Sequence, residues 1–235
     1  MVNNPYPERS DAVIEELANR LHAEYLAHDA LPLNFPVPVE EIAEQFLGYE
    51  IDFSETGIFS DPDILGGIDF EKNKIYVNAS VADHDGRYSF TVAHELGHHV
   101  LHRDHYLQSQ SADDEKILCR MTGRKPQIEM EADRFAAALL IPSDHVSKAA
   151  AERVRKVRTI GQARALANDL ITNSGFSNVS NSAMINRLKD LDFLPPGIPY
   201  QGASTRKTYG PPSTFPSLKK LISKCRRMVL RKLKF

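Results

Sequence analysis

The pentapeptide His-Glu-Leu-Gly-His at residues 94–98 constrains this chain more than any other segment. On an α-helix, residues four apart lie on one face about one turn apart, so His94 and His98 can reach the same metal ion. Imidazole nitrogens are good zinc ligands, and two of them leave room for a third protein ligand and a water molecule. Glu95 is then placed to accept a proton from that water rather than to bind the metal.

The residues around this motif favour a helix over 88–102 that turns one face toward the protein interior. At about 100° per residue, Phe90, Gly97 and Leu101 fall within roughly 60° of His94. Gly97 costs a helix interior about 1 kcal/mol relative to alanine, which is tolerable where another backbone must come close. The alternative interpretation is a buried helix with two hydrogen-bonded core histidines. The glutamate, the spacing and the glycine agree better with a zinc site.

The third ligand must come from outside the pentapeptide. A metzincin would carry glycine and histidine at the positions of Leu101 and Asp104, so that class is excluded. His102 continues the four-residue spacing, but it would lie about 12 Å from His94 along the axis, at roughly 1.5 Å per residue. Three ligands in such a row suit a tetrahedral site poorly. We therefore expect His102 to lie behind the ligands or at the surface.

Residues 128–140 offer a candidate for this third ligand. Plotted as a helix, they place Glu131 inside an apolar stripe, whereas Glu129 and Asp133 fall toward the solvated side. A carboxylate that points into an apolar face must be paired or metal-bound, because desolvating it alone costs too much. Glu131 is therefore the predicted third ligand of a two-histidine, one-glutamate zinc site. The alternative is a buried ion pair between Glu131 and an arginine such as Arg87.

Residues 85–102, which contain the pentapeptide, resemble the core of the ImmA/IrrE family of zinc metallo-endopeptidases. Residues 131–142 resemble the second signature of that family, with Asp133 where asparagine is common. Two shorter segments also match the family, residues 38–43 and residues 179–188. The resemblance implies a cytosolic protease, bacterial or from a mobile element, that cleaves a DNA-binding repressor and so switches on its genes.

The periodicity of the chain predicts an α+β fold. We expect a zincin-like core, in which a small β-sheet packs on the metal-binding helix and on a second ligand-bearing helix, with a helical C-terminal extension. The other expected elements are a helix over 11–27 capped by Ser10, a short helix over 39–47 closed by Gly48, strands over 49–53, 64–70 and 74–78, and helices over 161–171 and 180–191. The expected domains are an N-terminal helix at 1–34, the metallopeptidase core at 35–145, a helix-turn-helix-like extension at 146–195, and a flexible linker with a basic amphipathic tail at 196–235.

Several roles near the predicted site stay open. The polar segment over 103–125 is expected to be a loop and could act as a lid. Tyr76, His105 and Tyr106 are candidates for stabilising the oxyanion, and the sequence does not choose among them. A sheet edge beside the metal could hold an extended substrate by strand addition, or the strands could only pack behind the helix.

The helix pair over 161–171 and 180–191 has the pattern of a helix-turn-helix. Its second helix offers Arg187 and Lys189 but also Asp190, so the basic footprint for DNA is thin. We therefore favour packing or substrate docking over DNA reading for this pair.

The composition indicates a cytoplasmic protein. Residues 1–10 are polar without an apolar run, unlike a signal peptide, and the longest apolar stretch, residues 135–142, is too short to span a bilayer. Cys119 and Cys225 lie far apart and show no pairing pattern, so no disulfide framework is expected.

The net charge of −2 conceals an asymmetry between the two ends of the chain. Residues 201–235 carry ten Lys or Arg and no acidic residue, which leaves residues 1–200 at −12. Residues 217–235 combine apolar residues at helical spacing with lysines and arginines elsewhere. Such a tail could bind nucleic acid or an anionic membrane, or fold onto the acidic body of the protein.

These observations predict a zinc-dependent endopeptidase that acts on a protein substrate, with Zn²⁺ as its cofactor. His94, His98 and Glu131 are the predicted metal ligands, and Glu95 is the predicted general base. The resemblance implies that the substrate is a helix-turn-helix repressor, whose cleavage derepresses a stress response or a mobile element. The alternative is a metal-stabilised regulatory protein that binds a partner, nucleic acid or membrane without cutting. Glu95 argues against that alternative, since a purely structural metal site needs no general base.

Overall fold

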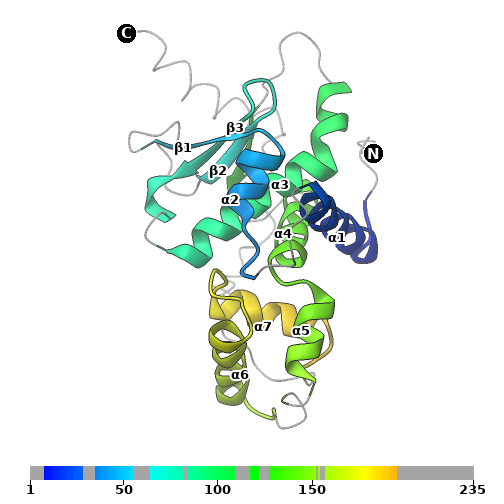
Figure 1. Cartoon of the computed structure of the whole chain (residues 1–235), viewed down its shortest axis with the longest axis vertical. Helices are drawn as coiled ribbons and strands as arrows, with labels where there is room; N and C mark the ends of the chain where they lie inside the picture. The colour runs from blue at the N-terminus through cyan, green and yellow to red at the C-terminus, as the bar shows by residue number, and fades with distance from the viewer. Residues whose placement is uncertain are drawn as a thin grey trace, which may run out of the picture.

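A small β-sheet lies against one long helix, and further helices cover the other side of that helix (Figure 1). The computed structural model of the chain describes residues 8–28, 35–54, 64–81, 84–108, 117–121, 127–151, 153 and 157–194. Over these residues the fold is α+β and mostly helical, as the sequence predicts. The linker and basic tail expected at 196–235 lie outside the described residues.

The sheet has four strands in the order β1-β3-β2-β4. They are β1 (Glu50–Ser54), β2 (Ile64–Asp69), β3 (Lys74–Asn78) and β4 (Ile117–Met121). β1 pairs with β3 in parallel, whereas β2 is antiparallel to both β3 and β4. β2 and β3 form an antiparallel hairpin, and both strands lie where the sequence predicts them. At its turn, Asp69 Oδ1 accepts hydrogen bonds of 3.0 Å from the backbone N–H groups of Glu71 and Lys72.

Strand β4 corrects the expectation of a loop over 103–125. The helix before it continues to Gln108, and Ile117–Met121 pairs with β2 as an outer strand. The apolar run at the start of this strand is too short to show a period within its polar surroundings, so only the pairing with β2 identifies it.

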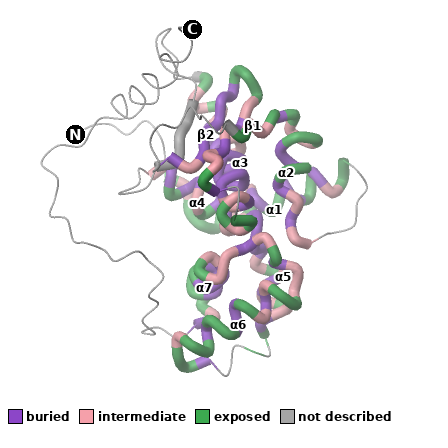
Figure 2. The backbone as a smooth tube through the Cα atoms, turned by 90° about the vertical axis from the view of Figure 1, so that its left-hand side faces the viewer, coloured by how far each residue is buried: buried purple, intermediate pink, exposed green. Residues whose placement is uncertain are grey.

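The two helices expected to bear ligands are α3 (Asp85–Gln108) and α4 (Gln127–Leu140). Every residue from Thr91 to His98 is buried, because α3 lies between the sheet and α4 (Figure 2). A Cβ atom on Gly97 would lie 3.1 Å from both Cα and the carbonyl oxygen of Ala132. Gly97 therefore lets the backbone of α4 approach α3 closely, as the sequence predicts.

The N-terminal helix α1 (Asp11–His28) packs on α4. Ser10 caps it as predicted, because its Oγ accepts a hydrogen bond from the backbone N–H of Val13 at 3.4 Å. The short helix predicted over 39–47 is present as α2 (Val39–Glu41) followed by one wider π-helical turn, η1 (Ile42–Phe46). Gly48 ends it with a φ of 73°.

Three helices form the part of the fold after the core: α5 (Ser143–Ala150), α6 (Ile160–Asn173) and α7 (Asn181–Asp190). The sequence predicts α6 and α7, and Ser180 caps α7 by accepting a hydrogen bond from the N–H of Ala183 at 3.2 Å. Helix α5 is an addition to the prediction. None of the described helices is both long and apolar enough to cross a lipid bilayer.

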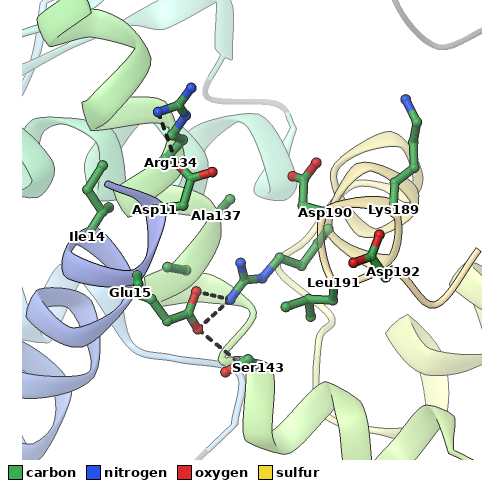
Figure 3. Close-up of a pocket in the computed structure, with 13 residues that line it drawn as sticks. Asp11, Ile14, Glu15, Arg134, Ala137, Ser143, Lys189, Asp190, Leu191 and Asp192 are labelled. Carbon is green, nitrogen blue, oxygen red and sulfur yellow. Dashed lines mark hydrogen bonds and ion pairs between the residues drawn. The ribbon is translucent and has the colours of Figure 1, made fainter. Parts of the chain in front are cut away.

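Arg187 of α7 is buried instead of facing outward. Its Nε donates to the carbonyl oxygen of Ile141 at 2.9 Å, and its Nη2 donates to both carboxylate oxygens of Glu15 at 2.5 Å. Glu15 also accepts from the N–H of Ser143, across a pocket between α1, α4 and α7 (Figure 3). Arg187, offered by the sequence as a DNA-reading side chain, thus joins three helical regions, which favours packing over DNA reading.

Candidate metal centre

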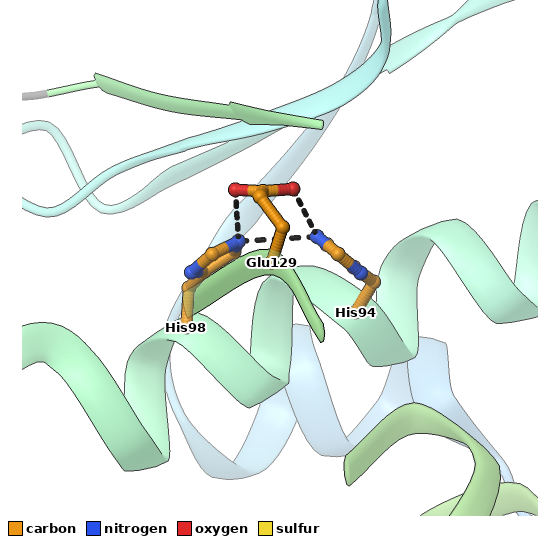
Figure 4. A group of neighbouring side chains, drawn as sticks. All are labelled: His94, His98 and Glu129. Carbon is orange, nitrogen blue, oxygen red and sulfur yellow. Dashed lines mark hydrogen bonds and ion pairs between the residues drawn. The ribbon is translucent and has the colours of Figure 1, made fainter. Parts of the chain in front are cut away.

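Three side chains from two helices converge inside the core. The Nε2 atoms of His94 and His98 lie 3.1 Å apart. Each also lies 3.3 Å from a different carboxylate oxygen of Glu129. Figure 4 shows the two imidazoles on consecutive turns of α3, with the carboxylate bridging their inner nitrogens. All three are buried, and they are the group within the described residues that could hold a metal ion.

The separations among these atoms fit a tetrahedral zinc ion. Zinc bonds to histidine nitrogen and carboxylate oxygen measure roughly 2.0–2.2 Å, which puts neighbouring ligand atoms of a tetrahedron about 3.3 Å apart. The separations of 3.1 and 3.3 Å are close to that value. The donor set is also one that zinc uses at catalytic sites, with a fourth position left for water.

Glu129 takes the place that the sequence analysis expected for Glu131. The apolar stripe of α4 is present, since Ala132 and Phe135 are buried, but the helix is also buried on the side of Glu129. That side packs on α3, where the imidazoles compensate the buried carboxylate. The spacing could have revealed this, because Glu129 and Asp133 are four residues apart, like the two histidines they face.

Glu131 is buried beside the cluster but bound elsewhere. Its Oε1 accepts hydrogen bonds of 3.0 Å from the backbone N–H of Arg9 and from Nε2 of Gln127. Its Oε2 lies 3.3 Å from Nη1 of Arg9 and 3.5 Å from Nε2 of His102. The alternative of a buried ion pair is therefore the better description of Glu131, with Arg9 as the partner instead of Arg87.

The outer nitrogens of both histidines have partners. Nδ1 of His94 lies 2.9 Å from Oδ1 of Asp133, and Nδ1 of His98 lies 2.9 Å from Nδ1 of His102. His102 thus lies behind His98 and away from the converging nitrogens, one of the two positions expected for it. Partners of this kind fix the tautomer and the orientation of a metal-binding imidazole.

Glu95 is fully buried on α3, where β2 crosses the helix. A Cβ atom on Gly66 would lie 2.5 Å from Cγ2 of Thr91 and 2.9 Å from Oε1 of Glu95. Glycine at this strand position therefore makes room for the Glu95 carboxyl group, a role that the sequence analysis did not assign. Of the oxyanion candidates, Tyr106 packs edge-on against Phe70 and Tyr76 lies half-buried on β3.

The electrostatics of the cluster favour a positive charge on His94. Burial lowers the pKa of His94, but the carboxylates of Asp133 and Glu129 outweigh it and raise the pKa to about 9. Burial raises the pKa of Glu129, but the two imidazoles outweigh it and the pKa falls below its usual range. Burial lowers the pKa of His98, so that it stays neutral. The Glu129 carboxylate and the neutral imidazole of His98 thus both lie beside a protonated His94.

A buried cluster of two histidines and a glutamate, next to a further buried glutamate, is the arrangement of a metallopeptidase. Residues 61–170 match the family model of the IrrE N-terminal-like domain, a peptidase family. The match spans α3 and α4, and it confirms the resemblance to the ImmA/IrrE family. It indicates a metallopeptidase of that type. No curated protein matches the chain.

Proposed function

We propose that this chain is a zinc-dependent endopeptidase. The convergence of His94, His98 and Glu129 at the separations of zinc ligands, beside buried Glu95, is the observation that carries the proposal. The match to a peptidase family over residues 61–170 supports it independently.

His94, His98 and Glu129 would hold the metal. Bound zinc would lower the pKa of a water from about 15.7 toward roughly 7 and polarise the scissile carbonyl. Glu95 accepts the proton of the attacking water and returns it to the nitrogen of the leaving amine. The burial of Glu95 keeps bulk water away from this proton, so that the proton goes to the leaving group.

The substrate binds as an extended chain along β4. This strand is the outer neighbour of β2, which crosses α3 at Glu95, and Figure 4 shows it passing above the cluster. Backbone hydrogen bonds to an outer strand hold a peptide segment whatever its sequence, so that side-chain pockets are left to select the substrate. A protein segment that unfolds locally can take the extended conformation that pairing with β4 needs.

The particular substrate that we propose is a DNA-binding transcriptional repressor. Its cleavage in the cytoplasm would derepress the genes of a stress response or of a mobile element. This step rests on the resemblance to the ImmA/IrrE family and on no residue of the site.

The test is to incubate the purified protein with any repressor encoded beside it, with and without a metal chelator. We expect fragments of defined mass that disappear with the chelator and return with zinc. Glu95→Gln should keep its zinc but cleave nothing, whereas Glu24→Gln, an exposed change on α1, should cleave as the wild type does. If Glu95→Gln still regulates the repressor in cells, the protein acts by binding and the proposal is wrong.

A further inference from the structure

The two histidines of the metal centre are supported in different ways. Nδ1 of His94 meets a carboxylate directly, that of Asp133 at 2.9 Å. Nδ1 of His98 meets a second imidazole, that of His102 at 2.9 Å, and a carboxylate comes only after it. That carboxylate belongs to Glu131, whose Oε2 lies 3.5 Å from Nε2 of His102. His102 therefore lies between His98 and its carboxylate, whereas His94 contacts its carboxylate directly.

The direction of the hydrogen bond between His98 and His102 follows from the groups around Glu131, beyond His102. Glu131 accepts two hydrogen bonds from Arg9 and one from Gln127, all from groups that can only donate. A carboxylate among such donors stays an acceptor. Its charge, 3.5 Å from Nε2 of His102, favours a hydrogen on that nitrogen, although the contact does not meet hydrogen-bond geometry. The neutral His102 then presents a lone pair at Nδ1, which accepts the hydrogen on Nδ1 of His98. His98 is left with its lone pair on Nε2, the nitrogen that faces His94 and Glu129.

We propose that Glu131 and His102 are positioning residues that keep the proton of His98 on Nδ1 and so reserve its Nε2 for the metal. Arg9, which precedes α1, holds Glu131 in this role and links the start of that helix to the metal centre. The inference rests on the proposed metal site but not on peptide cleavage, and it assigns a function to a buried carboxylate that binds no metal.

Replacing the carboxylate by an amide can reverse the direction of the hydrogen bond between His98 and His102. In Glu131→Gln the amide nitrogen takes the place of one carboxylate oxygen, and both oxygens face donor groups of Arg9, Gln127 or His102. Where the amide nitrogen faces His102, it can donate to Nε2. His102 would then carry its hydrogen on Nδ1 and force the hydrogen of His98 onto Nε2, where it competes with the metal. Losing an outer partner of a metal ligand typically weakens metal binding 10- to 100-fold.

The variants at His102 separate positioning from packing. His102→Asn places an amide oxygen near the former Nδ1, so that His98 keeps its acceptor and its orientation. His102→Leu fills similar space without any acceptor. A purely structural role predicts equal losses in these two variants, whereas the positioning role predicts that His102→Asn rescues metal binding.

Arg134 offers a matched control for Arg9, the residue that holds Glu131. It also joins α4 to the start of α1, but through an ion pair of 2.9 Å with Asp11 instead of Glu131. Arg134→Gln should therefore remove a link between the same two helices without changing the metal centre, and Arg9→Gln should weaken metal binding.

The test measures zinc dissociation constants and the visible spectrum of the cobalt-substituted protein, alongside the thermal unfolding of each metal-free variant. We expect about tenfold or greater loss of affinity and an altered cobalt spectrum in Glu131→Gln and His102→Leu. His102→Asn and Arg134→Gln should resemble the wild type. Long-range nitrogen–proton NMR of the zinc-loaded protein should show His102 with its hydrogen on Nε2.

Equal losses in His102→Asn and His102→Leu would overturn the proposal, and so would a hydrogen on Nδ1 of His102. Neither readout depends on proteolysis. A protein that cuts no substrate but shows these metal effects would refute the proposed function alone, and an active peptidase without them would refute only the positioning role.

Discussion

Asp133 lies 2.9 Å from Nδ1 of His94, one helical turn after Glu129, whose Oε2 lies 3.3 Å from Nε2 of the same imidazole. A single turn of α4 thus supplies both a candidate ligand and the group that orients the neighbouring one. A carboxylate that accepts the Nδ1 hydrogen holds the imidazole in the tautomer that binds metal through Nε2.

Asp133→Asn should change the metal centre little, because its amide oxygen still accepts the hydrogen of His94. Asp133→Ala leaves that hydrogen without its acceptor, and we expect zinc affinity to fall about tenfold. Competition with a chromophoric chelator measures both constants. If the asparagine variant loses as much affinity as the alanine variant, Asp133 acts through its charge and not through the orientation of His94.

Glu129→Ala should weaken zinc binding more than Glu131→Ala. The first variant removes a ligand, so we expect a loss beyond the 10- to 100-fold typical of an outer partner. The second variant disturbs only the support of His98, and its loss should fall within that range. Zinc content after dialysis, with unfolding curves to exclude collapse of the fold, decides between the two carboxylates. A larger loss in Glu131→Ala would restore the ligand set expected from the sequence.

The difference between these two glutamates shows how far the sequence alone can lead. The spacing of His94 and His98 was sufficient for a helix with a shared face, and the sequence also predicted the two strands β2 and β3. The apolar pattern used to choose Glu131 over Glu129 depends on which side of α4 meets α3. Apolar periodicity cannot show that, because the side that meets α3 carries carboxylates that the imidazoles compensate.

Zinc binding should release at least one proton at neutral pH. The metal-free protein carries a proton on His94, whose pKa is raised to about 9, whereas burial lowers the pKa of His98 and keeps it neutral. The apparent affinity for zinc should therefore rise at least about tenfold per pH unit up to about pH 9, where His94 loses its proton without the metal and its contribution to the slope ends. Calorimetric titration at pH 7 in buffers of different ionisation enthalpy counts the protons released. A count of zero would mean that His94 is neutral in the metal-free protein.

Gly97→Ala should destabilise the protein although alanine favours helices. A Cβ atom there would lie 3.1 Å from the backbone of Ala132, which cannot move aside as a flexible side chain can. Overpacking costs about 1–3 kcal/mol and exceeds the gain of up to about 1 kcal/mol in helix propensity. Gly161→Ala is the control, because its nearest neighbour would be Oγ1 of Thr159 at 3.9 Å. Urea unfolding should show a loss for the first variant and a small gain for the second, and a gain for both would mean that α4 can shift away from α3.

Glu15→Gln should destabilise the contact between α1 and α7. Arg187 has a side-chain exposure of only 8%, and the variant leaves its guanidinium without a charged partner. Breaking a fully buried pair costs about 3–5 kcal/mol, but the Glu15 side chain is 22% exposed, so we expect roughly 2 kcal/mol. Glu16→Gln, exposed on the same helix, controls for the loss of one negative charge. The free energies of unfolding of both variants measure the difference, and equal values would show that Arg187 is held by Ile141 and by packing without help from the ion pair.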